Sequence, residues 1–165
     1  MTMPRGPGVW GLGKGNMNTT MEVQASQSAR ARFEQLIRFA NEIKQDGFQL
    51  TSESEYAEVL QHIEDHKYLT NEGIPFEISM DQALFSWYEN VYHPMTRAID
   101  EAGLVYAFPD ATRAELFLWV TRHWHFLKQE NGPNVSAEAA AFSYGSKFGT
   151  GLILRLLNRV RLLAA

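Results

Sequence analysis

The sequence predicts an all-α fold: a single compact bundle of about six to seven helices, preceded by a disordered N-terminal arm. Three observations support this prediction. Apolar residues recur at helical spacing after residue 28, Ser or Thr capping signals open several of these stretches, and no stretch alternates apolar and polar residues as a strand would. The length of 165 residues fits one domain with a core of its own.

The first 28 residues differ in composition from the rest of the chain. They hold five glycines between positions 6 and 15, followed by a stretch rich in Ser, Thr, Gln and Asn. Such a segment has too little apolar surface to offset the entropy of ordering, so residues 1–28 are expected to be a disordered arm. The helical domain is then expected to span residues 29–149, and an amphipathic C-terminal helix is expected over residues 150–165.

The first two helices are predicted from an apolar stripe and from a cap. A stripe that starts at Phe33 predicts a helix over 29–45, which Gly47 closes. Ser52 and Glu55 then have the spacing of a capping box, in which each side chain binds a backbone N–H of the first helical turn. The second helix is expected to run from this cap to about residue 68.

A third capping pair, Ser79 with Gln82, predicts a helix that reaches Pro94. Proline lacks the backbone N–H and clashes with the preceding turn, so it is expected to break or bend this helix. It also suits the first turn of a helix, which predicts that the helix restarts there. Gly103 is expected to end the restarted helix as a glycine C-cap.

The segment richest in aromatic residues is predicted to be the central helix. It follows the Phe108-Pro109 pair, opens with a capping box of Thr112 and Glu115, and ends at residues 131–133, Asn-Gly-Pro. Two shorter helices are expected after it, over residues 136–148 and 152–163.

Composition and charge limit the classes of function. The chain has no cysteine, which excludes disulfides and thiolate chemistry, and no apolar run reaches the length of a membrane span. No apolar signal peptide is visible, so a cytoplasmic location is expected. The net charge is −4, with ten acids and two lysines in residues 42–81, whereas residues 147–165 hold four basic residues and no acid. This asymmetry favours a protein partner or a homo-oligomer over nucleic acid, for which a basic domain would be expected.

Two blocks of sequence carry a resemblance to a known family. The first block has Ser-Trp-Tyr, Val-Tyr and Pro within residues 86–94, and the second has Phe-Pro followed by Thr, Ala-Glu-Leu and Leu-Trp within residues 108–119. Both blocks resemble parts of an uncharacterised prokaryotic helical domain. That domain occurs in ParB-like proteins and transcriptional regulators, and the resemblance covers about residues 33–150. It implies a helical fold and a regulatory context but no chemistry. Asp110 and Ala111 stand where the family has Gly-Arg, and no ParB-like module precedes the first helix.

Three histidines are the candidate metal ligands. His62 and His66 are four residues apart on one predicted helix. His123, near the middle of the apolar stripe of the central helix, is the first choice for a third ligand, ahead of Glu115 or Asp81. Together the three histidines would make a metal-binding or hydrolytic module. The plainer interpretation has His62 exposed, His66 partly buried, and His123 as a buried neutral ring hydrogen-bonded to a carbonyl or a carboxylate. His62-Ile63 lacks the glutamate that follows the first histidine of zinc-protease helices, and no cofactor is expected.

The predicted C-terminal helix is the best clue to function, because it combines a wide apolar face with arginines as its only charges. The candidate interaction residues are Leu152, Arg155, Leu156, Arg159 and Val160. The helix could dock on the domain core or across a dimer, meet an acidic partner or an anionic membrane, or contact a phosphate backbone.

The favoured function is therefore a non-catalytic helical interaction or accessory domain. A helix-turn-helix over residues 93–127 is disfavoured, because its second helix is too apolar on all sides to read a DNA groove.

Overall fold

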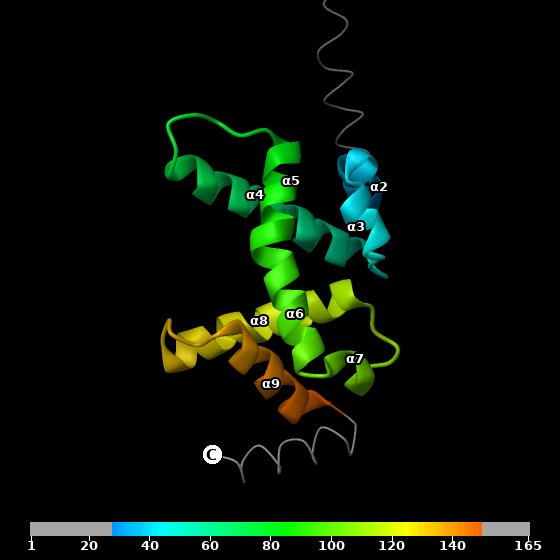
Figure 1. Cartoon of the computed structure of the whole chain (residues 1–165), viewed down its shortest axis with the longest axis vertical. Coiled ribbons are helices and arrows are strands. Elements are labelled where there is room, and N and C mark those ends of the chain that lie inside the picture. The colour runs from blue at the N-terminus through cyan, green and yellow to red at the C-terminus, as the bar shows by residue number, and fades with distance from the viewer. Residues whose placement is uncertain (1–27, 150–165) are drawn as a thin grey trace, which may run out of the picture.

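The computed structural model describes residues 28–149, and within them it confirms an all-α fold without strands (Figure 1). The elements are α2 (Ala29–Leu36), the 3-10 helix η1 (Ile37–Phe39), α3 (Asn41–Gln45), α4 (Glu53–Glu72), α5 (Met80–Trp87), the π-helical segment η2 (Tyr88–Tyr92), α6 (His93–Glu101), α7 (Leu104–Ala107), α8 (Arg113–Asn131) and α9 (Ala137–Phe148). The predicted arm before Ser28 and the predicted helix over 150–165 lie outside the described residues. No helix in residues 28–149 has the length and apolarity needed to cross a membrane.

The central feature of the fold is the continuous run of α5, η2 and α6, which forms the long axis of the molecule in Figure 1. α2 packs against α4, and α4 packs against α5, at one end of this run. α8 and α9 pack against each other and against α6 at the other end. The two ends are joined by this long helical element and by direct contacts between α4 and α8.

The three predicted capping boxes are all present. Ser52, Ser79 and Thr112 each accept a hydrogen bond from the backbone N–H three residues later, and the Glu or Gln at that position accepts the backbone N–H of the cap in return. Each box satisfies two backbone donors that the first helical turn leaves free. These caps fix where α4, α5 and α8 begin, within one residue of the prediction.

The prediction of one continuous helix over residues 29–45 is wrong. The chain forms α2, tightens into η1, and changes direction at Ala40, whose φ of −88° and ψ of 78° are not helical. Ile37 and Ile43 are both buried. Six residues on a straight helix would place them about 120° apart, on different faces. The break at Ala40 lets both side chains enter the core, and the burial outweighs the helical hydrogen bonds that are lost.

The predicted helix continues through Pro94 without a break. The helix widens into the π turn of η2 directly before the proline, and α6 then continues with Pro94 in its first turn. A π turn removes the need for the N–H that proline lacks and relieves the clash with the preceding carbonyls. As a result, the rings of Trp87 and Tyr92 are both fully buried on the core side of the run.

Gly103 adopts a left-handed conformation with φ of +69° between α6 and α7, so an alanine there is strained although its Cβ would meet only the ring of Tyr106 at 4.0 Å. Gly103→Ala is expected to lower the free energy of unfolding by about 1 kcal/mol. Gly73→Ala is the control, because Gly73 ends α4 with an ordinary φ of −92° and should change stability by less than about 0.5 kcal/mol. Urea denaturation of both variants measures the difference, and equal losses would contradict a conformational role for Gly103.

Candidate protein-interaction groove

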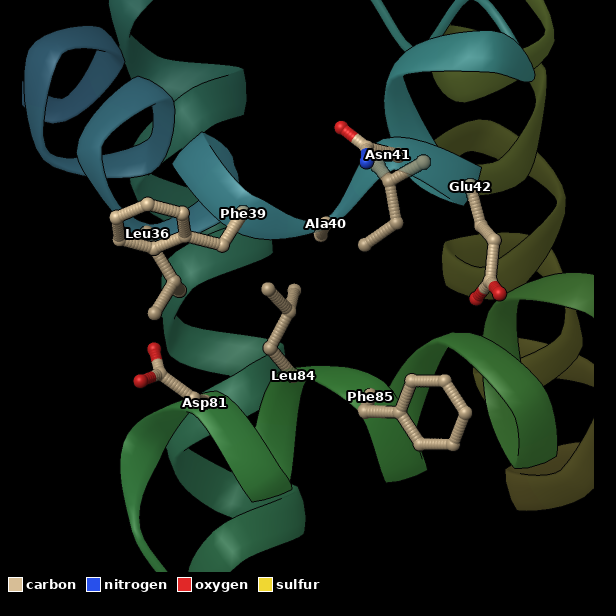
Figure 2. A pocket seen from close by; sticks show the side chains of 9 residues that line it. Leu36, Phe39, Ala40, Asn41, Glu42, Asp81, Leu84 and Phe85 are labelled. Atoms are coloured by element: carbon tan, nitrogen blue, oxygen red, sulfur yellow. The ribbon is translucent and has the colours of Figure 1, made fainter.

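A groove opens between the η1–α3 bend and the first half of α5, with a cavity volume of about 370 Å³ (Figure 2). We call it the α5 groove. Its lining residues are Leu36, Phe39, Ala40, Asn41, Glu42, Ile43, Asp81, Leu84 and Phe85. Figure 2 shows Leu84 rising from α5 into the centre of the opening, with the rings of Phe39 and Phe85 near its two ends.

The bend at Ala40 creates the most exposed aromatic side chain of the groove. Phe39 ends η1 with 86 % of its surface exposed, and the guanidinium of Arg38 lies 5.5 Å from the centre of its ring. Phe85 on the opposite wall is 57 % exposed, while its neighbour Leu84 is buried. Single exposed apolar residues are common on proteins, but two phenylalanines at the rim of one apolar cavity form a patch of the kind that marks an interaction site.

The polar part of the lining is acidic. Glu42 comes from α3 and Asp81 from the first turn of α5, and no basic side chain lines the cavity. Neither carboxylate takes part in an ion pair within residues 28–149. In Figure 2 they lie on opposite sides of Leu84. The groove therefore offers an apolar floor with two carboxylates to which a basic partner could bind.

Each of the three candidate histidines has a separate environment. His62 packs edge-on against Phe117, with ring centres 5.9 Å apart. His66 shares a hydrogen bond of 2.9 Å between its Nε2 and the hydroxyl of Ser86. His123 is 8 % exposed and makes a corresponding bond of 2.9 Å with the hydroxyl of Ser143.

These positions do not assemble the predicted metal site. In the described part of the chain, no three His, Asp or Glu side chains form a group that could hold a metal ion. His66 and His123 instead bind serine hydroxyls from neighbouring helices, α5 and α9. His123 is buried, as the plainer interpretation expects, but its partner is a hydroxyl and not a carbonyl or a carboxylate. His62 is half-buried, so its expected exposure is wrong. Neither pair has a carboxylate bonded to the ring within residues 28–149, so neither forms an acid–histidine–serine triad.

Burial lowers the pKa of His62, His66 and His123, because a charged imidazolium is poorly solvated in their surroundings. Lys147 lowers the pKa of His123 further. All three rings are therefore held neutral near pH 7, in the form that accepts or donates single hydrogen bonds without a counter-charge.

Acid is expected to destabilise the fold through these rings. The unfolded chain takes up protons as the pH falls below about 6.5, whereas the folded chain resists them until its lower pKa values are reached. The contribution of these rings to the free energy of unfolding should therefore be constant above about pH 7 and should decrease as the pH falls below about 6.5. Urea titrations across this range measure the slope. His62→Gln removes one titrating ring and should make the slope shallower; an unchanged slope would exclude His62 as a contributor.

A second hollow lies between α8 and α9, with a volume of about 390 Å³. It is lined by Trp119, Arg122, His123, Tyr144 and Phe148. The guanidinium of Arg122 forms an ion pair with Glu58 of α4, and the Nε2 of His123 is bound to Ser143. The charged group and the imidazole of this hollow are thus engaged within the fold, whereas the carboxylates of the α5 groove take part in no ion pair within residues 28–149. The α5 groove is therefore the stronger candidate site.

The sequence did not reveal the α5 groove in advance. The predicted interaction residues, Leu152, Arg155, Leu156, Arg159 and Val160, lie outside the described residues. One signal was present: Phe39 stands off the apolar stripe of its predicted helix, and a large ring there is either exposed or in need of a bend. Comparisons of the chain with protein-family models, with curated protein sequences and with solved structures give no match.

Proposed function

We propose that this protein is a non-catalytic interaction module, whose α5 groove receives an apolar segment of a protein partner. The observation that carries the proposal is the pair of exposed phenylalanines, Phe39 and Phe85, on the two walls of one apolar cavity. Burying two such rings contributes roughly 1.5–3 kcal/mol each when the partner fills the space well. Aromatic residues in this setting are typical interaction hot spots.

The chemistry of the remaining polar groups supports a binding role over a catalytic one. The histidines that could act as bases are bonded to serines or packed on Phe117, and they do not line the α5 groove. Two separate carboxylates, Glu42 and Asp81, are the only charged groups in its lining. A groove of this composition can select a partner by shape and by charge.

A regulatory setting is the finer part of the proposal, and it rests on the resemblance of residues 86–94 and 108–119 to the domain found in ParB-like proteins and transcriptional regulators. In such proteins a helical module without chemistry would bring a second protein to the complex. Direct reading of DNA fits less well, because α8 is buried on most sides over residues 114–118. A partner protein is therefore the favoured ligand.

Photo-crosslinking in cells that encode the chain tests the proposal. A benzoylphenylalanine at position 39 should link to one defined protein, because an occupied groove holds the partner within reach of this ring. The control carries the same probe at position 106, where Tyr106 is 82 % exposed and outside the groove. At least fivefold more product at position 39 than at 106 is expected. Equal labelling at the two positions would reject the groove as a binding site.

A further inference from the structure

We infer that the α5 groove is filled by residues 150–165 of a second copy of this chain, so that the protein pairs by exchanging its C-terminal segments. The inference rests on the proposed function and names the partner of the same groove. It draws on the composition of the segment, on the charge of the groove, and on where α9 ends.

The C-terminal segment has the composition that the groove requires. Taken as a helix, residues 150–165 place most of their large apolar side chains on one broad face. The members of this face are Leu152, Ile153, Leu156, Leu157, Val160 and Leu163. A helix with such a stripe binds an apolar groove through anchors at intervals of three and four residues.

The charges are complementary. The segment contains Arg155, Arg159 and Arg161 and no acidic side chain, whereas the groove is lined by Glu42 and Asp81 and by no basic side chain. Arg155 and Arg159 are four residues apart and flank one edge of the apolar face, so both can reach carboxylates beside the groove. Opposite charges around an apolar contact set the orientation of the two chains and discriminate against other partners.

The position of α9 favours a second copy over the segment's own chain. Figure 1 shows α9 and α2 at opposite ends of the long axis, with α5 and α6 between them, and α2 leads directly into the groove wall formed by η1. A 16-residue helix is only about 24 Å long, which is short for a segment that would have to extend along α6 and α5 to reach the groove of its own chain. Two chains related by a two-fold axis would each supply one segment and one groove, which buries both grooves in one closed dimer.

The first experiment uses the purified full chain with benzoylphenylalanine at position 39 and an equal mixture of ¹⁴N- and ¹⁵N-labelled protein. Irradiation is expected to give a product of dimer mass in which the peptide around position 39 is linked to a peptide from residues 150–165. Part of this product should join a ¹⁴N peptide to a ¹⁵N peptide, because the two peptides come from different chains. A product of monomer mass linked to the same residues would show that the chain binds its own segment, and it would overturn the exchange. The probe at position 106 is the control.

The second experiment measures dimer dissociation by sedimentation. Leu156→Asp places a charge in the apolar face and is expected to raise the dissociation constant at least tenfold. Asn158→Asp adds the same charge on the opposite side of the segment and should change it less than twofold. Circular dichroism checks that both variants keep the helix content of the wild-type chain. Equal effects of the two variants would overturn the inference.

A third experiment reverses the charges of the groove in one chain and those of the C-terminal segment in another, and asks whether mixing the two chains restores dimerisation. A chain with Glu42→Lys and Asp81→Lys, and a chain with Arg155→Glu and Arg159→Glu, should each dimerise at least tenfold more weakly than the wild type. When the two are mixed, both grooves meet segments of opposite charge, and a heterodimer of near wild-type affinity is expected. A mixture that stays monomeric would exclude the proposed pairing of charges.

These experiments separate failure of the inference from failure of the proposed function. If position 39 crosslinks in cells to a different protein and the purified chain stays monomeric, the groove binds a partner but the exchange is wrong. If position 39 gives no more product than position 106 in either setting, both are wrong.

Discussion

Replacing Phe117 by alanine is expected to lower the free energy of unfolding by about 3–5 kcal/mol. The ring is fully buried on α8 and contacts the aromatic residues that join the two ends of the molecule. Its centre lies 5.5 Å from that of Trp87, in an edge-on arrangement, and 5.1 Å from that of Tyr92. Removing it takes away the buried apolar area and leaves a cavity among these packed rings.

Phe76→Ala is the matched control, since Phe76 undergoes the same chemical change at an exposed position and should lose less than about 0.5 kcal/mol. Urea denaturation monitored by tryptophan fluorescence and circular dichroism gives both values. A loss below about 1.5 kcal/mol for Phe117→Ala would contradict a central role for this ring. If that variant does not fold, Phe117→Leu keeps most of the apolar volume and should show a smaller but measurable loss.

Local signals in the sequence were sufficient for the helix starts. Ser52, Ser79 and Thr112 were identifiable as caps because the hydrogen bonds they make involve only residues three positions away. The burial of His123 likewise followed from the period of α8. Such features depend on neighbours along the chain, and a single sequence contains them.

The features that the sequence did not show depend on distant neighbours. Nothing near Ala40 required a break in the helix; the break follows from the burial of both Ile37 and Ile43 against other helices. The π turn before Pro94 similarly reflects where the core accepts Trp87 and Tyr92. In both places tertiary packing overrode local helical preference.

The same distinction explains the candidate sites. His62 and His66 share a helix, so their spacing suggested common ligation, but His66 meets Ser86 and His62 meets Phe117 across the packed interface. The α5 groove has the opposite character, because its two walls come from segments about 40 residues apart and exist only after the bend at Ala40 has formed. A helical period assigns residues to a face, but it does not say what that face will meet.

Glu115→Ala is expected to cost about 2–4 kcal/mol, the second largest effect of a single substitution. The carboxylate of Glu115 is only 4 % exposed, and it binds two donors from different parts of the chain. Its Oε2 accepts the backbone N–H of Thr112 at 2.7 Å, and its Oε1 accepts the hydroxyl of Thr51 at 2.6 Å. The Thr112 hydroxyl in turn donates to the carbonyl of Gln49 at 2.6 Å. Removing the carboxylate leaves the backbone N–H of Thr112 without its acceptor and leaves the hydroxyl of Thr51 only a longer contact of 3.4 Å to Glu55. It therefore loosens the segment before α4 from the start of α8.

Glu55→Ala provides the matched control, because Glu55 holds the same position in the capping box of α4 but is less buried. It should cost about 1 kcal/mol, the usual effect of losing one such cap. Glu115→Gln keeps the size of the side chain but turns an amide N–H toward one of the two donors, so an intermediate loss is expected. Chemical denaturation of the three variants at one pH gives their free energies of unfolding. Equal decreases for Glu115→Ala and Glu55→Ala would show that Glu115 acts only as a cap of its own helix.

A double-mutant cycle isolates the long-range part of this effect. Thr51→Val removes the hydroxyl that reaches Glu115 and leaves the capping box of α8 in place. Combined with Glu115→Ala, it should cost about 1–2 kcal/mol less than the sum of the two single variants, because the bond between these side chains can be lost only once. Additive losses would show that Thr51 and Glu115 act independently. Coupling of the expected size would mean that one buried carboxylate both caps the start of α8 and anchors the segment that precedes α4.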